Sequence, residues 1–267
     1  MRQQTASDKK ELKVAIVGHG FVGKAMKRMF PHALIYDPLE KKLSSPQSQI
    51  NKADVGFVCV PTPMAKDGSC DTSIVESTIA WLDTSIIIIR STVKPGTTEK
   101  LCKLYPKKRI VFMPEYIGET TAHPFTDESL KNFLIFGGTK ENCSKSINIF
   151  QTVYNSSVKI LCVSATEAEI IKYMANTAAA TMVTLANEFY NICMAFGVPY
   201  DMVREGFLLD PRMSRYFTFV FPEQRGFGGK CLPKDLNAII KAAQQAGYSP
   251  EFVSAILINN DRVKGIK

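Results

Sequence analysis

A glycine-rich segment near the N-terminus constrains the fold of this chain more than any other part of its sequence. The segment reads Gly18-His-Gly20-Phe-Val-Gly23, and it directly follows the apolar run from Leu12 to Val17. A helix-compatible stretch comes next, and a second apolar segment ends at Asp37, 19 residues after Gly18. This order and spacing are typical of the first strand, turn and helix of a dinucleotide-binding Rossmann unit.

Each residue type in this segment suits the binding of a dinucleotide. Gly18 permits the tight turn, Gly20 lets the backbone approach the pyrophosphate, and Gly23 allows the helix to pack closely on the strand. The pyrophosphate is then expected at the N-terminus of the helix. The residues expected to contact the cofactor here are Gly18, Gly20, Phe21, Val22 and Gly23.

Asp37 ends this segment and predicts which dinucleotide binds. A carboxylate at this place accepts hydrogen bonds from the adenosine ribose hydroxyls and repels a 2′-phosphate. We therefore expect NAD rather than NADP as the cofactor. Lys41 and Lys42 follow within a few residues and soften this preference slightly.

Further apolar runs follow at the spacing of alternating strands and helices. We expect strands at 55–60, 85–90, 109–113 and 133–136, and a helix at 72–82. Runs that are apolar throughout predict a parallel sheet covered on both faces. Ligands of such sheets bind beyond the carboxyl ends of the strands, so the residues there are candidates, with loop caps or solvated charges as the alternative. The candidates are Pro61, Thr62, Thr92, Glu115, Tyr116, Ile117 and Glu119.

From about residue 160 the pattern becomes helical. The run from Ala165 to Phe196 keeps a helical period without Gly or Pro, and a helix of this length is expected to span a domain or dimer interface. Lys172 and Asn176 lie four residues apart and share one of its faces. Its apolar stripe consists of Ile170, Ile171, Met174, Ala178, Met182, Leu185 and Phe189, and shorter helices are expected at 201–208, 234–245 and 251–259.

These patterns predict the fold class and the domain organisation. We expect an α/β protein with a Rossmann-type, doubly wound parallel sheet, followed by an all-helical domain with one long central helix. The predicted bounds are 1–160 for the NAD-binding domain and 161–248 for the helical domain, which would also dimerise. Residues 249–267 are expected to begin a linker helix.

A second glycine-rich loop, Gly226-Phe-Gly228-Gly229-Lys-Cys231, places one cysteine directly before a helix-compatible run. Glycines let backbone and substrate approach closely, and the positive end of a helix dipole favours the thiolate form of a cysteine. Lys234 adds a positive charge, and Asp235 shares the helical face four residues on. The loop therefore predicts an activated nucleophile with an acid or base beside it, and a buried, inert cysteine is the alternative.

Composition argues against several other classes of function. The 7 cysteines are dispersed without a CxxC pair, which predicts reduced thiols in a cytoplasmic protein, and the 3 histidines lack metal-ligand spacing. The apolar runs are too short to span a membrane. The net charge of +8 is spread over short groups, which fits an anionic small-molecule substrate better than nucleic acid.

Taken in order, six motifs of this chain resemble those of the UDP-glucose/GDP-mannose dehydrogenase family. They are GHGFVG at Gly18, VPTP at Val60, STVKPGT at Ser91, PEYIGE at Pro114, KYMAN at Lys172 and GFGGKCLPKD at Gly226. The resemblance covers about residues 12–260, and the cysteine motif is its most specific part. It implies the NAD-dependent oxidation of a nucleotide-sugar primary alcohol, with UDP-glucose as the expected substrate, to the carboxylate in two hydride transfers.

The resemblance also implies catalytic roles. Cys231 would capture the intermediate aldehyde as a thiohemiacetal, which the second hydride transfer converts to a thioester. Lys172 and Asn176 would stabilise the oxyanions, and Asp235 would order a catalytic water together with Lys172. Glu119 would be the acid and base of thioester hydrolysis, and Thr92 would position the water. Glu115 would either contact these catalytic residues from outside the reaction centre or lie beside the cofactor.

Cofactor and substrate contacts follow from the same motif positions. The implied cofactor contacts are Gly18, Gly20, Phe21, Val22, Gly23, Asp37, Pro61, Thr62, Thr92, Glu115 and Lys234. The implied substrate contacts are Glu115, Tyr116, Ile117, Glu119, Lys172, Asn176, Tyr216, Arg225, Gly226, Gly228 and Cys231. Ordinary loop packing is the alternative for Tyr216 and Arg225. No metal ligand is expected.

Members of that family carry a third domain that binds much of the nucleotide diphosphate. This sequence ends at Lys267, soon after the segment that resembles the helix leading into that domain. We therefore expect a site completed by a separate chain, a different nucleotide sugar, or an inactive fragment. The resemblance and the long helix together imply a homodimer.

Two other hypotheses about the function stay open at this point. A β-hydroxyacid dehydrogenase of the 3-hydroxyisobutyrate or 6-phosphogluconate type also combines a Rossmann domain with a helical domain that carries a Lys-x-x-x-Asn helix, but it needs no cysteine. A non-catalytic protein that binds NAD or a partner is the second reading. The intact set of candidate catalytic residues argues against that second reading.

Overall fold

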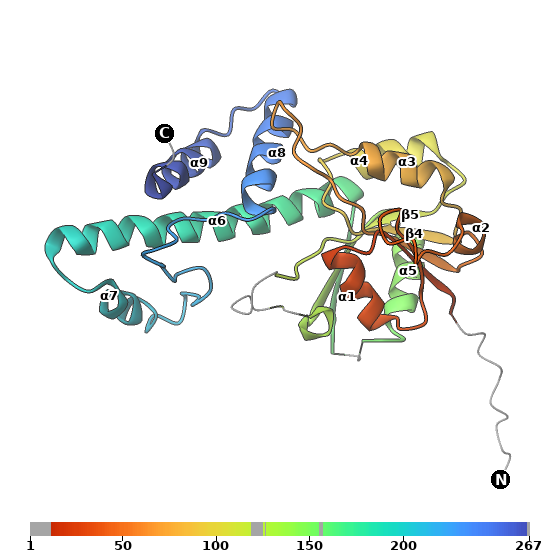
Figure 1. Cartoon of the computed structure of the whole chain (residues 1–267), viewed down its shortest axis with the longest axis horizontal. Helices are drawn as coiled ribbons and strands as arrows, with labels where there is room; N and C mark the ends of the chain where they lie inside the picture. Colours follow the sequence, from red (N-terminus) through yellow and green to blue (C-terminus); the bar gives the residue numbers. More distant parts are fainter. Residues whose placement is uncertain (1–11, 119–124, 126, 155–156, 266–267) are drawn as a thin grey trace, which may run out of the picture.

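The computed structural model describes residues 12–118, 125, 127–154 and 157–265 of the chain (Figure 1). The strands are β1 (Val14–Val17), β2 (Leu34–Tyr36), β3 (Val55–Val58), β4 (Ile86–Ile89), β5 (Ile110–Phe112), β6 (Phe133–Gly137) and β7 (Lys159–Val163). The helices are α1 (Phe21–Met29), α2 (Gln47–Ile50), α3 (Ser73–Trp81), α4 (Thr97–Leu104), α5 (Lys140–Phe150), α6 (Ala165–Phe196), α7 (Tyr200–Phe207), α8 (Leu232–Gln245) and α9 (Glu251–Lys264), with a 3-10 turn η1 (Glu128–Leu130). The expected α/β unit with one long helix leading to a helical part is therefore confirmed.

The seven described strands form one sheet in the order β2-β1-β3-β4-β5-β6-β7. The first five strands pair in parallel, with Ile16 opposite Phe57 and Phe57 opposite Ile88. The strand order changes direction between β1 and β3, because β2 lies on one side of β1 and the later strands lie on the other. Such a switch point opens a ligand crevice at the carboxyl ends of the strands.

One pair of strands differs from the expected parallel sheet. β6 meets β5 in antiparallel orientation, through the single register pair Phe112 and Gly137, whereas β6 and β7 are parallel. A parallel neighbour requires a crossover connection, usually a helix that packs on the sheet. The described part of the connection from β5 to β6 holds only the three-residue turn η1, so β6 enters from the opposite end of the sheet.

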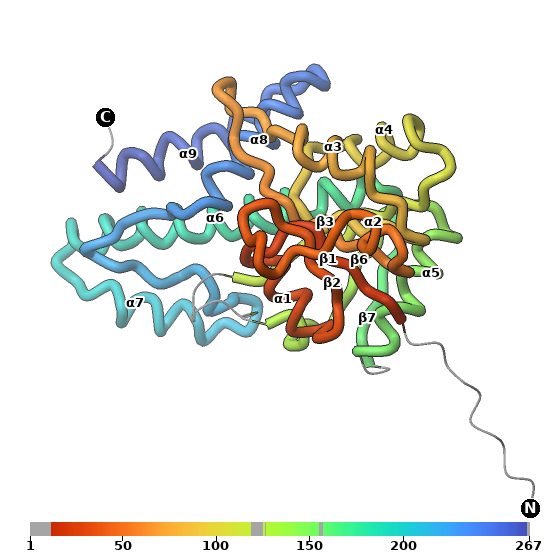
Figure 2. The backbone as a smooth tube through the Cα atoms, turned by 45° about the vertical axis from the view of Figure 1, so that its right-hand side comes forward, coloured from red at the N-terminus to blue at the C-terminus, as the bar shows by residue number. Residues whose placement is uncertain are grey.

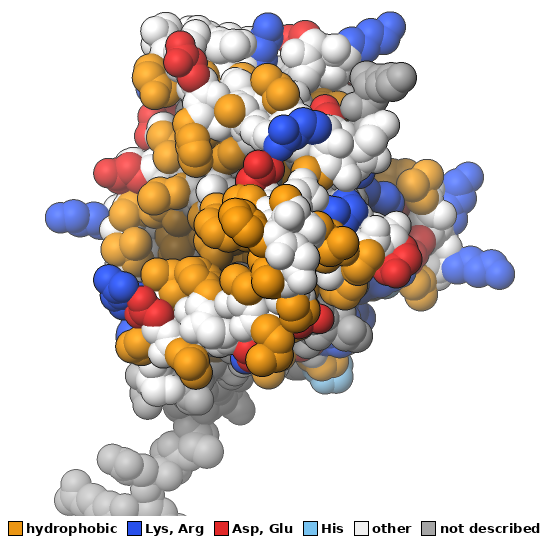
Figure 3. All heavy atoms as spheres, turned by 90° about the vertical axis from the view of Figure 1, so that its left-hand side faces the viewer, with side chains coloured by type: hydrophobic (Ala, Val, Ile, Leu, Met, Phe, Trp, Pro, Cys, Tyr) orange, Lys and Arg blue, Asp and Glu red, His pale blue; other side chains and the backbone are white. Residues whose placement is uncertain are grey.

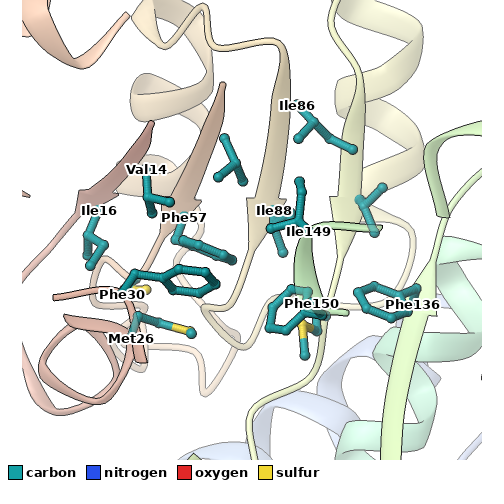
Figure 4. Packing of buried hydrophobic residues seen from close by; sticks show 14 of the residues in the cluster. Val14, Ile16, Met26, Phe30, Phe57, Ile86, Ile88, Phe136, Ile149 and Phe150 are labelled. Carbon is teal, nitrogen blue, oxygen red and sulfur yellow. The ribbon is translucent and has the colours of Figure 1, made fainter. Parts of the chain in front are cut away.

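The sheet is buried on both faces, which explains why its strands are apolar throughout. On one face Ile16, Phe57 and Ile88 pack with Phe30 of the segment after α1 and with Phe150 of α5 (Figure 4). On the other face alternate residues of the same strands pack with α2, α3 and α4. Burial of this kind is the main favourable term in folding a unit of this size.

The turn from β1 into α1 depends on two glycines that lie against neighbouring backbone. Gly18 has φ +90, and a Cβ there would lie 2.6 Å from the carbonyl oxygen of Cys59 on β3. A Cβ on Gly23 would overlap the carbonyl oxygen of Gly18 itself. Gly20, between them, has nothing within 4 Å of the Cβ position. The first and third glycines are therefore needed for packing, and Gly20 leaves open space.

Helix α6 begins on the sheet and ends far from it. Ser164 caps its N-terminus in a capping box with Glu167, and Gly197 ends it in the left-handed conformation. Near its start, Ala168 lies over Gly137 of β6, where an added Cβ would be 2.5 Å from the Ala168 Cβ. Glu169 accepts hydrogen bonds from the backbone N–H groups of Gly96 (2.6 Å) and Thr98 (2.8 Å) at the start of α4.

The distal part of α6 packs with the remaining helices. In both views α8 and α9 lie along one side of α6, and α7 lies on the other (Figures 1 and 2). A small core joins Ala180 of α6, Phe227 of the cysteine loop, Leu236 of α8 and Ile256 of α9. Among the described helices, none is both long enough and apolar enough to cross a membrane.

Much of the expected apolar stripe of α6 is exposed. Met174 is 73% exposed, and Ile170, Leu185 and Phe189 are each more than a third exposed. At the end of the molecule where α6 meets α7, hydrophobic side chains surround a hollow (Figure 3). A hollow of about 130 Å³ in this region is lined by Met182, Leu185, Ala186, Phe189, Tyr200, Val203, Arg204, Phe207 and Thr218.

The second and third glycines of the first turn, Gly20 and Gly23, allow a test of this account. We expect Gly23→Ala to lower the free energy of unfolding by about 1–3 kcal/mol, because its Cβ must displace the backbone of Gly18. Gly20→Ala is the matched control and should leave the urea midpoint unchanged, since its Cβ meets open space. Equal loss of stability in both variants would contradict the assigned roles.

Candidate active site

The centre of the candidate site is a row of polar side chains between α6 and α8. Lys172 Nζ donates to Asn176 Oδ1 at 3.3 Å, one turn along α6, which confirms that the two share a face. Asn176 Nδ2 donates to Asp235 Oδ2 at 2.5 Å, in the first turn of α8. Lys172 and Asp235 are both buried. Residues 59 positions apart thus form one continuous polar contact.

Asp235 has a second cation beside it. Lys234 Nζ lies 2.8 Å from Asp235 Oδ1, an ion pair in which the two atoms are close but not aligned as a hydrogen bond. The Asp235 side chain is 2% exposed and that of Lys234 is 17% exposed. A buried carboxylate is costly unless it is paired, so Asn176 and Lys234 together explain why Asp235 can lie here.

Cys231 lies directly before α8, at its N-cap, and is exposed. Its carbonyl oxygen accepts from the N–H of Asp235 at 2.8 Å, so residue 231 lies one helical turn before Asp235 of the polar row. Cys231 therefore combines access from solvent with a buried lysine, a partly buried asparagine and a buried carboxylate on the elements beside it. This is the exposure that a nucleophile needs, and the expectation of a buried cysteine under the alternative is wrong.

Asn260 of α9 holds the cysteine loop (residues 226–231) in place. Its Oδ1 accepts from Phe227 N at 2.6 Å and its Nδ2 donates to Phe227 O at 3.1 Å, so one side chain pairs both backbone groups of a buried residue. Lys264 Nζ also approaches Phe227 O, at 3.4 Å. The position of the loop thus depends on a helix 33 residues further along the chain.

The loop after β5 brings Glu115 and Tyr116 to the same site. The Lys172 ammonium lies 5.1 Å from the centroid of the Tyr116 ring, a cation–π contact. Burial, and then the charge of Glu115, raise the pKa of Tyr116 to about 12. Glu115 is buried and accepts from the N–H of Ile117. Glu119, expected as the acid and base of hydrolysis, lies outside the described residues.

A buried charge cluster of Arg90, Glu115, Glu128 and Lys131 supports that loop. Glu128 Oε1 lies 2.9 Å from Arg90 Nη2 and 2.5 Å from Lys131 Nζ. Burial alone would raise the pKa of Glu128, but the charges of Arg90 and Lys131 more than offset this and lower it. The carboxylates of Glu128 and Glu115 likewise outweigh burial and raise the pKa of Arg90. Two cations and two carboxylates compensate one another inside the protein.

The start of α1 fits a dinucleotide. No side chain caps its N-terminus, and the open space at Gly20 allows a phosphate to approach the backbone. Asp37, at the end of β2, accepts from His19 N at 2.7 Å and from Leu39 N at 2.9 Å, so its carboxylate lies against the glycine turn. Phe21 is 41% exposed beside it, and Val22 is partly buried. These features are the ones that pyrophosphate and ribose binding require.

The other predicted cofactor contacts lie at the ends of β3 and β4. Pro61 is exposed and Thr62 is buried directly after β3, and Thr92 is half-buried after β4. The hydroxyl of Ser91 donates to Val60 O at 2.6 Å, which ties these two strand ends together. Pro61, Thr62 and Thr92 therefore lie at the carboxyl ends of the strands, the same edge of the sheet at which α1 begins.

Two predicted substrate contacts differ in their surroundings. Arg225 contacts Asn187 and Asn191 through hydrogen bonds of 2.6–3.0 Å and stacks on Tyr190 at 4.4 Å. Asn187 is eleven residues beyond Asn176, which is about 16 Å along the helix axis. The structure thus holds Arg225 away from the polar row and against α6, whereas Tyr216 is 49% exposed. Gly226 and Gly228 form the cysteine loop itself, and the Gly226 N–H donates to Asn187.

Several residues that shape the site were missed by the sequence analysis. They are Asn187 and Asn260, which hold the cysteine loop, Glu169, which fixes α6 to α4, and Arg90 and Glu128 of the buried charge cluster. Burial raises the pKa of Glu169 to about 7, although the hydrogen bonds from Thr98 and Gly96 oppose this. The only sequence signal for any of them was a polar residue at a core position, as for Glu169 in the first turns of α6.

No group of three or more His, Cys, Asp or Glu residues with the arrangement of a metal site occurs in the part of the chain that the structure describes. The charged groups on the elements beside Cys231 are instead Lys172, Lys234 and Asp235. The site as described can bind an anion, stabilise a developing oxyanion and present a thiol.

A dinucleotide-binding sheet joined to a helical part that carries a buried lysine and an exposed cysteine defines a class of protein, the NAD-dependent dehydrogenases of Rossmann type. Two family models match this chain. Residues 37–158 match the NAD binding domain of the UDP-glucose/GDP-mannose dehydrogenase family, and residues 166–262 match its central domain. The chain belongs to the UDP-glucose/GDP-mannose dehydrogenase family, and its cofactor is NAD.

Individual relatives agree with this assignment. The chain is 30% identical over 228 residues to a UDP-glucose 6-dehydrogenase of Pseudomonas aeruginosa, covering 79% of this chain and 49% of the relative. It is 30% identical over 219 residues to a UDP-N-acetyl-D-mannosamine dehydrogenase of Pyrococcus horikoshii, covering 76% and 50%. The chain spans about half the length of these relatives.

A solved structure shows the same fold. The UDP-glucose dehydrogenase of Pyrobaculum islandicum superimposes with a TM-score of 0.80 at 23% identity, covering 97% of this chain and 70% of that chain. The agreement extends over both the sheet and the helical part.

The Asn260 contact leads to a prediction about the cysteine loop. Asn260→Ala should lower the free energy of unfolding by about 1–3 kcal/mol, because the buried Phe227 N–H loses its acceptor. Labelling of Cys231 by iodoacetamide, followed by peptide mass spectrometry, should change in rate because the loop is released. Asn259→Ala is the control, since among the described residues the Asn259 side chain donates to Ala255 O, within α9 itself. An unchanged labelling rate in Asn260→Ala would contradict the role of this contact.

Proposed function

We propose that this chain oxidises the C6 primary alcohol of a nucleotide sugar, with UDP-glucose as the leading substrate, to the carboxylate. The observation that carries the proposal is the row Lys172–Asn176–Asp235, in which Lys172 and Asp235 are buried and Asp235 lies one helical turn after the exposed Cys231. A thiol beside an oxyanion-binding lysine is the arrangement that oxidation through an aldehyde requires. The overall change is one alcohol, two NAD⁺ and one water to one carboxylate, two NADH and three protons.

The first oxidation needs a proton acceptor and a place for negative charge. NAD, when bound at the start of α1, accepts a hydride from the carbon in each oxidation. We propose that a water molecule, ordered by Lys172 and Asp235, accepts the proton of the hydroxyl. Lys172 and Asn176 stabilise the negative charge that develops on the oxygen, because both present N–H donors on the same face of α6.

The second oxidation passes through Cys231. Its sulfur forms a bond to the aldehyde carbon, and the thiol proton passes to the aldehyde oxygen, which gives a thiohemiacetal. Loss of a hydride from carbon and a proton from oxygen leaves a thioester. Water then attacks the carbonyl and the carbon–sulfur bond breaks, which leaves the carboxylate, releases one proton and returns Cys231 as the thiol. We assign Glu119 as the acid and base of this last step and Thr92 to the positioning of the water.

Binding roles complete the proposal. We assign cofactor binding to Gly18, Gly20, Phe21, Val22, Gly23, Asp37, Pro61, Thr62, Thr92, Glu115 and Lys234, and substrate binding to Glu115, Tyr116, Ile117, Glu119, Lys172, Asn176, Gly226, Gly228 and Cys231. Tyr216 stays a candidate substrate contact. Arg225 acts by holding the cysteine loop, because its guanidinium is paired with Asn187 and Asn191. A hydroxyacid dehydrogenase has no use for Cys231, so that alternative is not favoured.

We further propose that the protein is a homodimer that buries the exposed face of α6 and α7. Leu185, Phe189, Val203 and Phe207 are each 41–47% exposed on that face, around the hollow shown in Figure 3. An apolar face of this kind is typical of a surface that a second subunit covers. Sedimentation equilibrium should give a mass near twice 29.7 kDa, and a monomer would contradict the proposal.

Three further expectations stay predictions. They are the domain bounds at 160 and 248, a cytoplasmic location, and a separate chain that completes the nucleotide site. The expectation of a separate chain can be tested by measuring, with calorimetry, whether this chain alone binds UDP.

The stoichiometry of NADH tests the function most simply. With UDP-glucose, a UDP-N-acetyl sugar and GDP-mannose offered separately, we expect two NADH for each sugar acid formed from the true substrate. Cys231→Ser should form at most one NADH per sugar and no carboxylate, because the aldehyde is no longer held as a thiohemiacetal.

Cys162→Ser is the matched control for this experiment, since Cys162 on β7 is also exposed. It should keep the full stoichiometry. Two NADH per sugar in Cys231→Ser would contradict the covalent mechanism, and no turnover of any of the three sugars by the intact chain would contradict the substrate class.

A further inference from the structure

Two carboxylates, not one, lie beside the glycine turn at the end of β2. Asp37 accepts from His19 N at 2.7 Å. Three residues on, Glu40 Oε2 lies 2.6 Å from His19 Nδ1. The Glu40 N–H bonds Asp37 O at 3.1 Å, which closes a turn between them. We call Asp37 and Glu40 the acidic pair, and His19 contacts both of its members.

His19 places the acidic pair where the adenosine end of a dinucleotide binds. It is the middle residue of the Gly18-His19-Gly20 turn, over which the pyrophosphate passes into the start of α1. Its side chain is 10% exposed, so the imidazole is held between the turn and Glu40. The Glu40 carboxylate is 35% exposed and therefore faces both the turn and solvent.

The cations near the acidic pair do not cancel its charge. Lys24 Nζ, in the first turn of α1, lies 3.9 Å from Glu40 Oε1 and is 56% exposed, which leaves it largely in water. Lys41 and Lys42 are exposed on the turn beyond Glu40. A phosphate on the 2′-oxygen of the ribose would thus meet two negative charges on one short loop.

We propose that Glu40, held by His19, is a specificity-determining residue that makes the chain reject NADP. Asp37 alone explains a preference for the unphosphorylated ribose, since it can accept hydrogen bonds from the hydroxyls. Glu40 adds repulsion that no hydroxyl contact requires. Loss of Asp37 by itself should therefore leave discrimination against NADP in place, and loss of both carboxylates should abolish it.

The test measures binding of the reduced cofactors without any sugar. Dissociation constants for NADH and NADPH come from the change in nicotinamide fluorescence on binding, and the quantity of interest is their ratio. Glu40→Gln keeps the shape of the side chain and a hydrogen-bonding group for His19 but removes the charge. We expect this variant to lower the ratio of the dissociation constant for NADPH to that for NADH by about tenfold or more, chiefly because NADPH binds more tightly.

Two further variants separate charge from structure. Glu40→Asp keeps the charge and should retain most of the discrimination, even if the contact to His19 is altered. Glu188→Gln removes a half-buried carboxylate on α6 that pairs with Arg262 at 2.8 Å, and it should leave the ratio unchanged. A ratio in Glu40→Gln within about twofold of the intact chain, or an equal change for both cofactors, would overturn the proposal. Because no sugar is present, this outcome is independent of the chemistry assigned to Cys231.

Discussion

The attachment of α6 to the sheet is the constraint on which the rest of the site depends. Ala168 packs over Gly137, where any larger residue would collide with it, and Glu169 accepts two backbone hydrogen bonds from the start of α4. Both contacts lie about one helical turn before Lys172. Because α6 cannot rotate or slide without breaking them, the directions of Lys172 and Asn176 are fixed relative to the carboxyl ends of the strands, where we propose that the cofactor binds.

Polar contacts extend from this fixed helix in two directions. Toward the sheet, Lys172 lies against the ring of Tyr116, whose loop rests on the buried charge cluster. Toward the helical part, Asn176 bonds Asp235 at the start of α8, the helix that follows Cys231 directly. A hydride acceptor on the sheet and a thiol on the helical part can act on the same carbon only if their separation is constant, and a single uninterrupted helix provides this.

The sequence predicted the features that depend on local pattern. The bounds of α6, the six strands from β1 to β6 and the shared face of Lys172 and Asn176 follow from periodicity, from Gly197 and from a spacing of four residues. The antiparallel pairing of β6 with β5 was not predicted. β7 was missed because it lies at the edge of the sheet and its residues are largely exposed. The contacts of Asn260 with Phe227 and of Arg90 with Glu128 join residues 33 and 38 positions apart, which no local pattern encodes. The acidic residue Glu40 was passed over because only its contact with His19 distinguishes it from a solvated charge.

The central claim is that the aldehyde carbon becomes bonded to Cys231 at the meeting of α6 and α8. The direct measurement is rapid acid quenching of the intact protein with UDP-glucose and NAD⁺, followed by digestion and mass spectrometry of the peptide that contains residue 231. The account predicts a transient thioester adduct on Cys231 whose mass equals that of the sugar nucleotide acid less water. Formation of the acid with residue 231 unmodified at every time point, or an adduct on another cysteine, would contradict it.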